Sequence, residues 1–497
     1  MTSDLASKPD ESRRLFLRVF PSIMLPMFIA ISDQTLVATA LPAIAADLGQ
    51  VTLITWIVVA FLMMNSLAAP VYGRFGDLIG RRQMMLIALT FVILGASIVI
   101  TATNVHVIIF GRAIQGLGGG GLMSLSQALI GQMVPLRKRG SYQGYLAAVN
   151  ATATVAGPML GGLLTQQFGW RIALALTIPL ALIALVLTLR LPKVPSRGSV
   201  ANFDAPGLIF FAATVVLLLL AVQQLEGIAR GGSPFLMLLL VCGAVATLTL
   251  LARREKRAAS PLFPLPVLSH PAIWRSACFA ACHGATYVSL VAITPLYLIA
   301  ARGLNANMVG FLLLTLTMGV GVSSMITGHL VSRTGRTMVF PSIGVTVLAA
   351  LLLVFAWRSP TLNTWQLPMF YFAISLCIGT VMGVLQVTVQ YVAGPENLGV
   401  AASAVQFSRT LGASLGTSLV GAVIFISLQA GDGRAAEAFG MALRGAMELP
   451  ASEALQIRGE MLAAFRPGFL TVAAFAVLGC LMGWSNPVRR MTAEPSE

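Results

Sequence analysis

The chain has 497 residues, of which 57% are hydrophobic and 10% are charged, and its mean hydropathy is +0.86. Soluble domains carry about 25% charged residues, so this composition excludes a soluble globular protein and predicts an integral membrane protein. The formal net charge of +15 does not indicate a nucleic-acid binder, because the basic residues form short clusters between apolar segments and follow no DNA-binding motif.

Fourteen apolar stretches follow one another along the chain, and each is long enough to cross a hydrocarbon core about 30 Å thick. They predict an all-α integral membrane protein with transmembrane helices at 16–42, 51–72, 84–103, 105–134, 140–166, 171–190, 205–224, 234–252, 273–301, 306–330, 337–357, 366–392, 396–428 and 466–484. Lysine and arginine concentrate in alternate loops, as cytoplasmic loops require. We therefore expect both termini to be cytoplasmic.

The first predicted helix carries a carboxylate, Asp33, and the fourth carries a guanidinium, Arg112. Asp33 lies nine residues before Pro42, and Arg112 lies eight residues after Asn104. At about 1.5 Å per residue, both lie roughly 12–13 Å from the outer ends of their helices, near the middle of the bilayer. An ionised side chain at that depth is costly and usually serves transport or coupling. The alternatives are an interfacial position for Asp33 and a purely structural ion pair for Arg112.

The segment GRFGDLIGRR follows the second helix and forms a predicted cytoplasmic turn. Gly73 and Gly80 permit tight backbone geometry, and Asp77 adds a negative charge between them. Arg81 and Arg82 anchor the third helix at the inner surface. The segment is a candidate for conformational gating, and the simpler alternative is a solvated turn.

A weak internal repeat indicates that the chain has two related halves. The segment GHLVSRTGRT follows the tenth helix and has Ser332 where the first copy has Asp77. Parallel six-helix repeats are a known transporter plan, with the substrate site near the midplane between them. We expect a cytoplasmic tail at 1–15, a six-helix bundle at 16–190, a two-helix insertion at 205–252, a second six-helix bundle at 273–484 with a periplasmic loop at 429–465, and a cytoplasmic tail at 485–497.

The fifth predicted helix contains Gly157, Pro158, Gly161 and Gly162, so one side of it is nearly bare backbone. Proline removes a helix hydrogen bond and small residues allow close packing, so we expect a kink and a close helix contact. Close packing alone explains these residues as well as a gating role does.

Several other polar residues fall within predicted helices and are candidates for a central cavity. The selected residues are Gln115, Gln127, His283, Tyr287 and Arg409. Histidine can titrate near neutral pH, but a neutral, hydrogen-bonded imidazole is the alternative for His283 when it is buried. Most of the others could satisfy one another between helices.

Together these motifs resemble the major facilitator superfamily, and specifically its 14-helix drug:proton antiporter family, over nearly the whole chain. DQTLVATALP is similar to the family's helix-1 signature, GRFGDLIGRR to the loop between helices 2 and 3, GRAIQGLGGGGL to the arginine motif of helix 4, and AGPMLGG to the exporter motif of helix 5. One position departs from the pattern, because Leu78 stands where a basic residue often follows the aspartate.

The resemblance implies a major facilitator fold of two six-helix bundles plus two extra helices. It implies that helices 1 and 4 line the central cavity, where Asp33 is the proton-carrying partner of Arg112. It also implies that Asp77 caps the thirteenth helix, in the opposite half, and that the Gly-Pro motif favours export over uptake.

The sequence contains no nucleotide-binding loop, metal-ligand cluster or catalytic triad spacing, so we expect no enzyme, metal site or cofactor. The leading hypothesis is a proton-coupled exporter of amphipathic small molecules or drugs across the bacterial cytoplasmic (inner) membrane. A dedicated transporter of one metabolite and a transporter-like receptor without turnover are the alternatives. We expect a functional monomer in the lipid bilayer whose partners are substrate and protons, with a periplasmic adaptor protein as a candidate partner and no nucleic acid.

Overall fold

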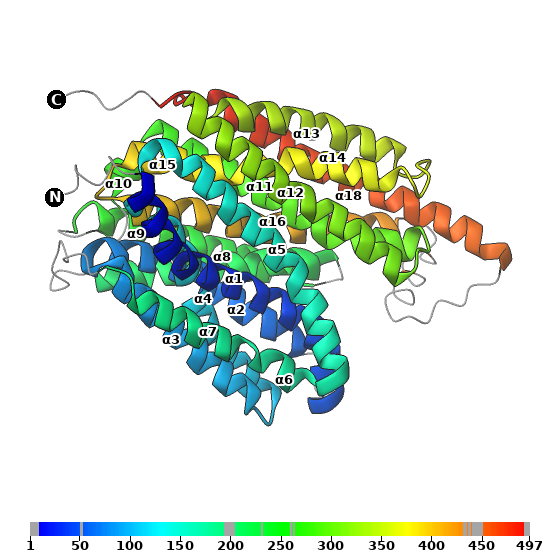
Figure 1. Cartoon of the computed structure of the whole chain (residues 1–497). Coiled ribbons are helices and arrows are strands. Elements are labelled where there is room, and N and C mark those ends of the chain that lie inside the picture. Colours follow the sequence, from blue (N-terminus) through cyan, green and yellow to red (C-terminus); the bar gives the residue numbers. More distant parts are fainter. Residues whose placement is uncertain are drawn as a thin grey trace.

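The computed structural model describes residues 9–49, 53–192, 204–229, 232–258, 261, 264–430, 435, 439 and 451–491. These residues form a bundle of long helices that run roughly along one direction (Figure 1). The helices are α1 (Pro9–Leu48), α2 (Ile54–Ile79), α3 (Arg81–Ile100), α4 (Val105–Met133), α5 (Leu136–Phe168), α6 (Trp170–Ala175), α7 (Thr177–Leu189), α8 (Ala205–Ala229), α9 (Pro234–Glu255), α10 (Leu265–Leu268), α11 (Pro271–Leu296), the π-helix η4 (Tyr297–Ala301), α12 (Ala306–Thr334), α13 (Val339–Arg358), α14 (Leu367–Gly379), α15 (Met382–Ala393), α16 (Leu398–Gln429) and α18 (Ala451–Ser485).

Thirteen helical stretches among the described residues are long and apolar enough to cross a membrane, so the protein is a multi-pass membrane protein. Helix α4 corresponds to the remaining one of the fourteen predicted spans, but it is too polar to be counted among these thirteen stretches. It carries Arg112, Gln115, Gln127 and a run of glycines, and most of its residues are buried inside the bundle. A helix that other helices surround does not need an apolar surface for lipid.

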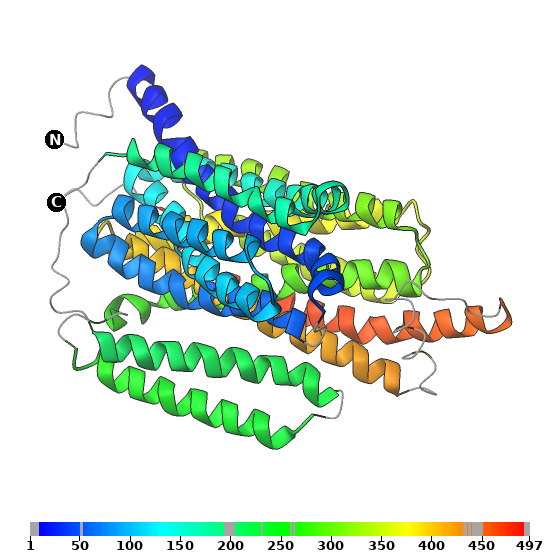
Figure 2. The same cartoon turned by 90° about the horizontal axis from the view of Figure 1, so that it is seen from below.

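The helices form two groups, α1–α7 and α11–α18, and each group has its own buried apolar clusters. Helices α8 and α9 pack against each other along one side of the bundle (Figure 2). Helix α8 also contacts both groups through α2 and α16, and the ring centroids of Phe211 in α8 and Phe407 in α16 lie 5.5 Å apart.

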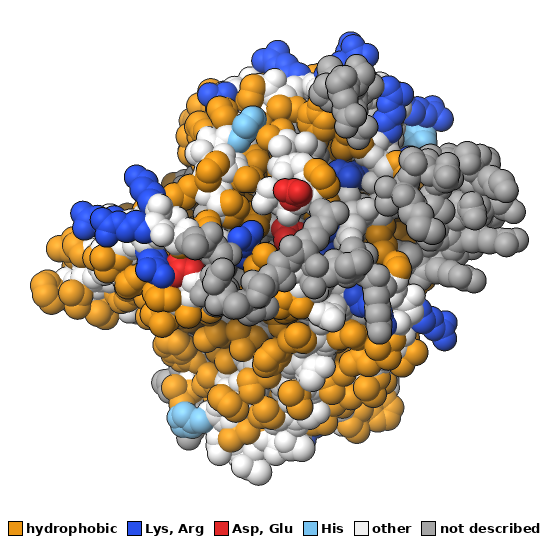
Figure 3. Space-filling model, turned by 90° about the vertical axis from the view of Figure 1, so that its left-hand side faces the viewer, with side chains coloured by type: hydrophobic (Ala, Val, Ile, Leu, Met, Phe, Trp, Pro, Cys, Tyr) orange, Lys and Arg blue, Asp and Glu red, His pale blue; other side chains and the backbone are white. Residues whose placement is uncertain are grey.

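The two groups meet through α5 with α12 and through α2 with α16. A Cβ atom at Gly328 would collide with the carbonyl oxygen of Gly140, and one at Gly73 would lie 2.6 Å from the carbonyl oxygen of Gly399. Both backbone contacts lie toward the end of the bundle that carries the termini, and the groups diverge toward the other end (Figure 1). Lysine and arginine side chains gather around the rim of the terminus-bearing end (Figure 3).

Two of the predicted helices are broken in the structure. The span 171–190 is divided into α6 and α7 at Leu176. Pro179 lies in the first turn of α7 and has no N–H to donate to the preceding turn. The span 366–392 is divided into α14 and α15, and there the carbonyl oxygen of Gly379 accepts a hydrogen bond from the hydroxyl of Ser324, which lies in α12.

The structure has helix or a backbone contact inside three segments that the sequence assigned to two tails and a loop. Helix α1 begins at Pro9 inside the predicted tail 1–15. Helix α18 begins at Ala451, inside the predicted loop 429–465, because apolar residues recur every four positions there and bury their side chains against the core: Ile457, Met461 and Phe465. In the predicted tail 485–497, the N–H of Met491 donates to the carbonyl oxygen of Gly335 at 2.8 Å.

Parts of these predicted segments lie outside the described residues. They are residues 1–8 and 492–497 of the two tails and residues 431–434, 436–438 and 440–450 of the loop.

Replacing Gly120 with alanine tests the close packing of α4 on α2. The added Cβ would collide with the backbone carbonyl oxygen of Asn65, so we expect Gly120→Ala to lower the free energy of unfolding by about 1–3 kcal/mol. Gly162→Ala is the matched control, because no atom lies within 4 Å of its added Cβ. Thermal unfolding of both purified variants in detergent measures the difference. Equal midpoints for the two variants would contradict the packing described.

Candidate functional site

A charged network is buried among α1, α4 and α7. The Nη1 of Arg112 lies 2.5 Å from Oδ2 of Asp33 and donates to Oε1 of Gln115 at 2.9 Å. The Oδ1 of Asp33 accepts hydrogen bonds from Nε2 of Gln115 at 3.3 Å and from the hydroxyl of Thr177 at 3.0 Å. Asp33 is 4% exposed and Arg112 is 1% exposed. Both carboxylate oxygens are therefore hydrogen-bonded although water is excluded.

Thr177 belongs to this network, and the sequence analysis missed it. Its position depends on the break at Leu176, because Thr177 is the first residue of α7. Pro179, two residues later, was the available signal, since proline is tolerated in the first turn of a helix but not in its interior. An unbroken helix over 171–190 gave no reason to single out this threonine.

Arg112 is also held by an aromatic ring and by close backbone packing. Its Cζ lies 4.1 Å from the centroid of the Phe61 ring of α2, which is a cation–π contact. A Cβ at Gly95 of α3 would lie 2.6 Å from the backbone nitrogen of Gln115, so the missing side chain lets α3 support this part of α4. The guanidinium of Arg112 is thus held by Asp33, by Gln115 and by the Phe61 ring.

The carboxylate of Asp77 lies at the N-terminus of α16. It accepts hydrogen bonds from the backbone N–H of Gly399 at 3.0 and 2.9 Å and from that of Val400 at 3.1 Å. The Nη2 of Arg81 lies 2.5 Å from the same carboxylate, and Nη1 of Arg81 donates to Gln132 at 2.7 Å. A negative charge is favourable where the free N–H groups and the positive end of a helix dipole meet.

The other candidate residues of the segment GRFGDLIGRR make backbone contacts or turns: they are Gly73, Gly80 and Arg82. Gly73 is in backbone contact with Gly399, and Gly80 has φ 113°, a conformation that strongly favours glycine. Arg82 donates from Nη2 to the carbonyl oxygen of Leu189 at 2.7 Å. These contacts fix the turn between α2 and α3 beside the ends of α7 and α16.

The second copy of the segment uses a hydroxyl group in place of a carboxylate. The backbone N–H and the hydroxyl of Ser141 in α5 both lie 3.0 Å from the hydroxyl oxygen of Ser332 in α12. The two copies therefore join opposite groups of helices at the same end of the bundle, one through a charged side chain and one through neutral groups.

The four small or kinking residues of α5 separate into two sets. Cβ atoms at Gly157 and Gly161 would collide with the hydroxyl oxygens of Thr35 and Thr39 in α1, so these glycines bring α5 against the helix of Asp33. Gly162 has open space beside it, and Pro158 lies inside α5. The predicted close contact of α5 therefore involves α1 and two of the three glycines.

Three of the predicted cavity residues line one cavity between the two groups of helices, namely Gln127, His283 and Arg409, whereas Gln115 belongs to the Asp33 network. This small cavity of about 10 Å³ is lined by residues that include Gln127 of α4, His283 of α11, Gln386 of α15 and Arg409 of α16. The His283 and Tyr287 rings stack, with centroids 6.3 Å apart.

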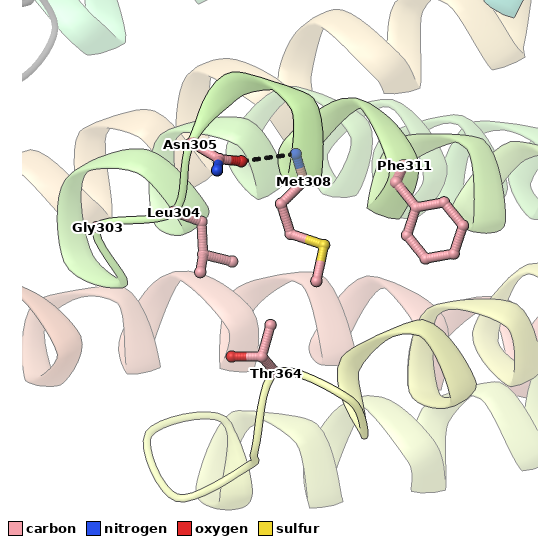
Figure 4. Close-up of a pocket in the computed structure, with 6 residues that line it drawn as sticks. All are labelled: Gly303, Leu304, Asn305, Met308, Phe311 and Thr364. Atoms are coloured by element: carbon pink, nitrogen blue, oxygen red, sulfur yellow. Dashed lines mark hydrogen bonds between the residues drawn. The ribbon is translucent and has the colours of Figure 1, made fainter.

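A larger depression of about 590 Å³ lies at the outer end of α12, lined by Gly303, Leu304, Asn305, Met308, Phe311 and Thr364 (Figure 4). Its polar interaction is the cap of α12, where the side-chain oxygen of Asn305 accepts from the backbone N–H of Met308 at 3.0 Å. The depression contains none of the predicted site residues, and its lining has no charged side chain.

Comparisons with known proteins agree with this architecture. The family model of the Major Facilitator Superfamily matches residues 23–417. An uncharacterized MFS-type transporter of Mycobacterium tuberculosis is 33% identical over 417 residues, which cover 82% of this chain and 59% of that protein. The efflux pump dotC of Dothistroma septosporum is 30% identical over 335 residues, covering 66% of this chain and 58% of the relative. The chain thus spans less than two thirds of the length of these two relatives.

A third relative and two solved structures extend the comparison. The multidrug transporter protein MdtP of Bacillus subtilis is 26% identical over 431 residues, covering 84% of this chain and 77% of that protein. The human organic anion transporter MFSD10 has a TM-score of 0.62 at 15% identity, covering 96% of this chain and 100% of that chain. The proton:xylose symporter XylE has a TM-score of 0.58 at 14% identity, covering 95% and 96%. These two likenesses concern the fold alone.

Substituting Asp77 tests whether its carboxylate holds α2 against α16. We expect Asp77→Asn to weaken the contact and to raise the labelling rate of a cysteine at Ser403, which is 1% exposed beside Gly73. Hydrogen bonds to a charged group contribute about 1.5–3 kcal/mol, so the rate should rise about tenfold or more. A membrane-impermeant thiol reagent on the purified protein measures it, with the native cysteines as background.

Asp47→Asn is the matched control for that measurement. Asp47 pairs with Arg171 at 2.7 Å, but both side chains are nearly half exposed, so the pair contributes little. The cysteine of Ser403→Cys is labelled in three proteins: with Asp77 intact, with Asp77→Asn and with Asp47→Asn. If the labelling rate is the same in all three, the carboxylate of Asp77 does not hold this end of the bundle closed.

Proposed function

The chain belongs to the major facilitator superfamily, and on that premise we propose that it is a proton-coupled exporter of amphipathic small molecules. Its family makes it a transporter rather than an enzyme. The observation that carries the finer proposal is the Asp33–Arg112 pair, which lies inside the bundle with neither side chain more than 5% exposed. Ionisable residues inside a membrane bundle mark ion or proton pathways.

Proton exchange takes place on the carboxylate of Asp33. While the carboxylate is ionised it is matched by Arg112 and by hydrogen bonds from Gln115 and Thr177. Water or substrate that enters the space between the helices weakens this pairing, and Asp33 then accepts a proton. When the pair forms again, the proton is released. Asp33 thus gains and loses a proton in each cycle of opening and closing.

Alternation between the two sides of the membrane uses the contacts at the terminus-bearing end. The Asp77 contact with α16 and the Ser141–Ser332 contact hold this end closed. We infer that both termini are cytoplasmic, so the structure corresponds to an outward-facing arrangement. Opening toward the cytoplasm must break both contacts while the two groups of helices rock about the central layer.

Export of varied compounds is favoured over uptake for two reasons. Two of the relatives are named as an efflux pump and a multidrug transporter, and the segment AGPMLGG of α5 resembles the exporter motif of the family. We propose a monomer in the bacterial cytoplasmic membrane that takes amphipathic compounds from the cell. A periplasmic adaptor is the further partner we propose, at the end away from the termini.

Loss of the carboxylate should uncouple transport from protons. In efflux-deficient bacteria we expect the wild-type protein to lower the accumulation of at least two among ethidium, fluorescein and chloramphenicol. Asp33→Asn cannot carry the proton, so accumulation should return to the empty-vector level at matched expression. Asp47→Asn, which lies in the exposed pair at the helix end, should behave as the wild type.

The outcomes separate the alternatives. Equal accumulation in all strains would count against multidrug export and favour a transporter of one metabolite. Efflux that persists in Asp33→Asn would rule out Asp33 as the proton carrier. Collapse of the proton gradient by an uncoupler should abolish the wild-type effect.

A further inference from the structure

Arg409 is a cation in the membrane interior whose counter-ion the structure does not supply. It lies eleven residues after Leu398, the first residue of α16, which is about 17 Å along the helix axis. Among the described residues, four ion pairs are formed and none of them includes Arg409. Asp33 and Asp77 are each matched by another arginine, so neither is left to balance this charge.

The guanidinium of Arg409 is also incompletely hydrogen-bonded. Its Nη2 donates to Oε1 of Gln406 at 3.0 Å, and its Nη1 contacts the thioether sulfur of Met382 at 3.5 Å. Sulfur is a weak acceptor, and a guanidinium offers donors in a planar fork that matches a carboxylate. Arg409 is partly rather than fully buried, and it lines a small cavity together with residues of α4, α11 and α15.

Two amide oxygens beside Arg409 lack donors. Gln127 and Gln386 line the same cavity as Arg409, are 3% and 2% exposed, and each has an Oε1 without a hydrogen-bond partner in the described structure. The nitrogen of Gln386 is already used, since it donates to the carbonyl oxygen of Ala402 at 3.3 Å. Buried acceptors without donors are rare and point to a missing partner.

His283 does not supply that partner. Its Nε2 lies 3.1 Å from the carbonyl oxygen of Ile378, so this nitrogen is the donor of an internal hydrogen bond. The cavity of about 10 Å³ has room for roughly a single water. A larger ligand therefore enters when the two groups of helices separate.

We propose that this cluster is a substrate-binding site, and that among the exported compounds it selects amphipathic organic anions that also carry a hydrogen-bond donor. Arg409 binds the anionic group, and the amide oxygens of Gln127 and Gln386 accept from a hydroxyl or N–H of the same molecule. This inference rests on the proposed export function and adds its substrate class. The site draws on α4 from one group of helices and on α15 and α16 from the other, so the ligand contacts both groups.

Three related probes separate the need for a negative charge from the need for a hydrogen-bond donor. They are para-hydroxycinnamate, which has the anion and the donor, para-methoxycinnamate, which lacks the donor, and para-hydroxycinnamamide, which lacks the charge. Their binding to the purified full-length chain in detergent, measured by isothermal titration calorimetry, needs no proton gradient. We expect the wild type to bind para-hydroxycinnamate about tenfold or more tightly than either analogue.

The variants assign each preference to its residue. Arg409→Gln should remove the preference for the acid over the amide, and Arg409→Lys should keep part of it, because lysine retains the charge but not the planar fork. Gln127→Leu should remove the preference for hydroxyl over methoxy and leave the charge preference intact. Arg171→Gln, in the exposed pair with Asp47, is the matched control and should bind as the wild type does.

Several results would overturn the assignment. Absence of saturable binding of para-hydroxycinnamate by the wild type, or equal binding of all three probes, excludes the proposed ligand class. Unchanged preferences in Arg409→Gln, with a lower thermal midpoint, show that Arg409 is a structural residue. Replacing chloride with gluconate in the buffer tests whether the site binds a small inorganic anion instead. In that case chloride would weaken the binding of para-hydroxycinnamate, and the protein would bind para-hydroxycinnamate and para-methoxycinnamate equally well. Efflux of ethidium and chloramphenicol tests the export function separately, so failure of one proposal does not imply failure of the other.

Discussion

The absence of water inside the bilayer is the constraint on which this structure depends. Asp33 and Arg112 are both buried inside the bundle, where an unpaired charge is costly, and their mutual contact joins α1 to α4 with help from Thr177 of α7. Glycines make this geometry possible, because α4 approaches α2 and α3 so closely that side chains at Gly120 and Gly95 would collide with backbone atoms. The pair is thus a structural link between helices and, on our proposal, also the site where a proton is exchanged. A change in its protonation alters the contacts of three helices at once.

The two contacts that close the terminus-bearing end differ in their chemistry. Asp77 binds the N-terminus of α16 with a full negative charge, whereas Ser332 meets Ser141 through neutral hydrogen bonds and the adjoining glycines bring α5 against α12. Charge-assisted hydrogen bonds are roughly twice as strong as neutral ones. On the proposed alternation, the α5–α12 contact is therefore the weaker of the two that must break.

The sequence was sufficient for the elements that depend on local composition. Hydropathy predicted the helices, and counting residues gave Asp33 and Arg112 similar depths along their helices, which agrees with the ion pair that they form. It was insufficient where the outcome depends on packing between distant segments. Thr177 reaches Asp33 only because α6 and α7 are separate helices, and the buried stripe at the start of α18 was hidden among charged residues that predicted a loop. The polar residues of the central layer were recognised, but their unmatched charge and unpartnered oxygens became evident only from their neighbours.

The central claim is that substrate entry loosens the Asp33–Arg112 pair and lets Asp33 accept a proton, and proton uptake on binding measures this most directly. A transported compound is added to the purified protein in weakly buffered detergent solution, and the pH change is followed with an indicator dye. We expect the wild type to take up protons as it binds the compound, and Asp33→Asn to bind the same compound without taking up any. Binding by the wild type with no proton uptake, or uptake that persists in Asp33→Asn, would contradict the claim.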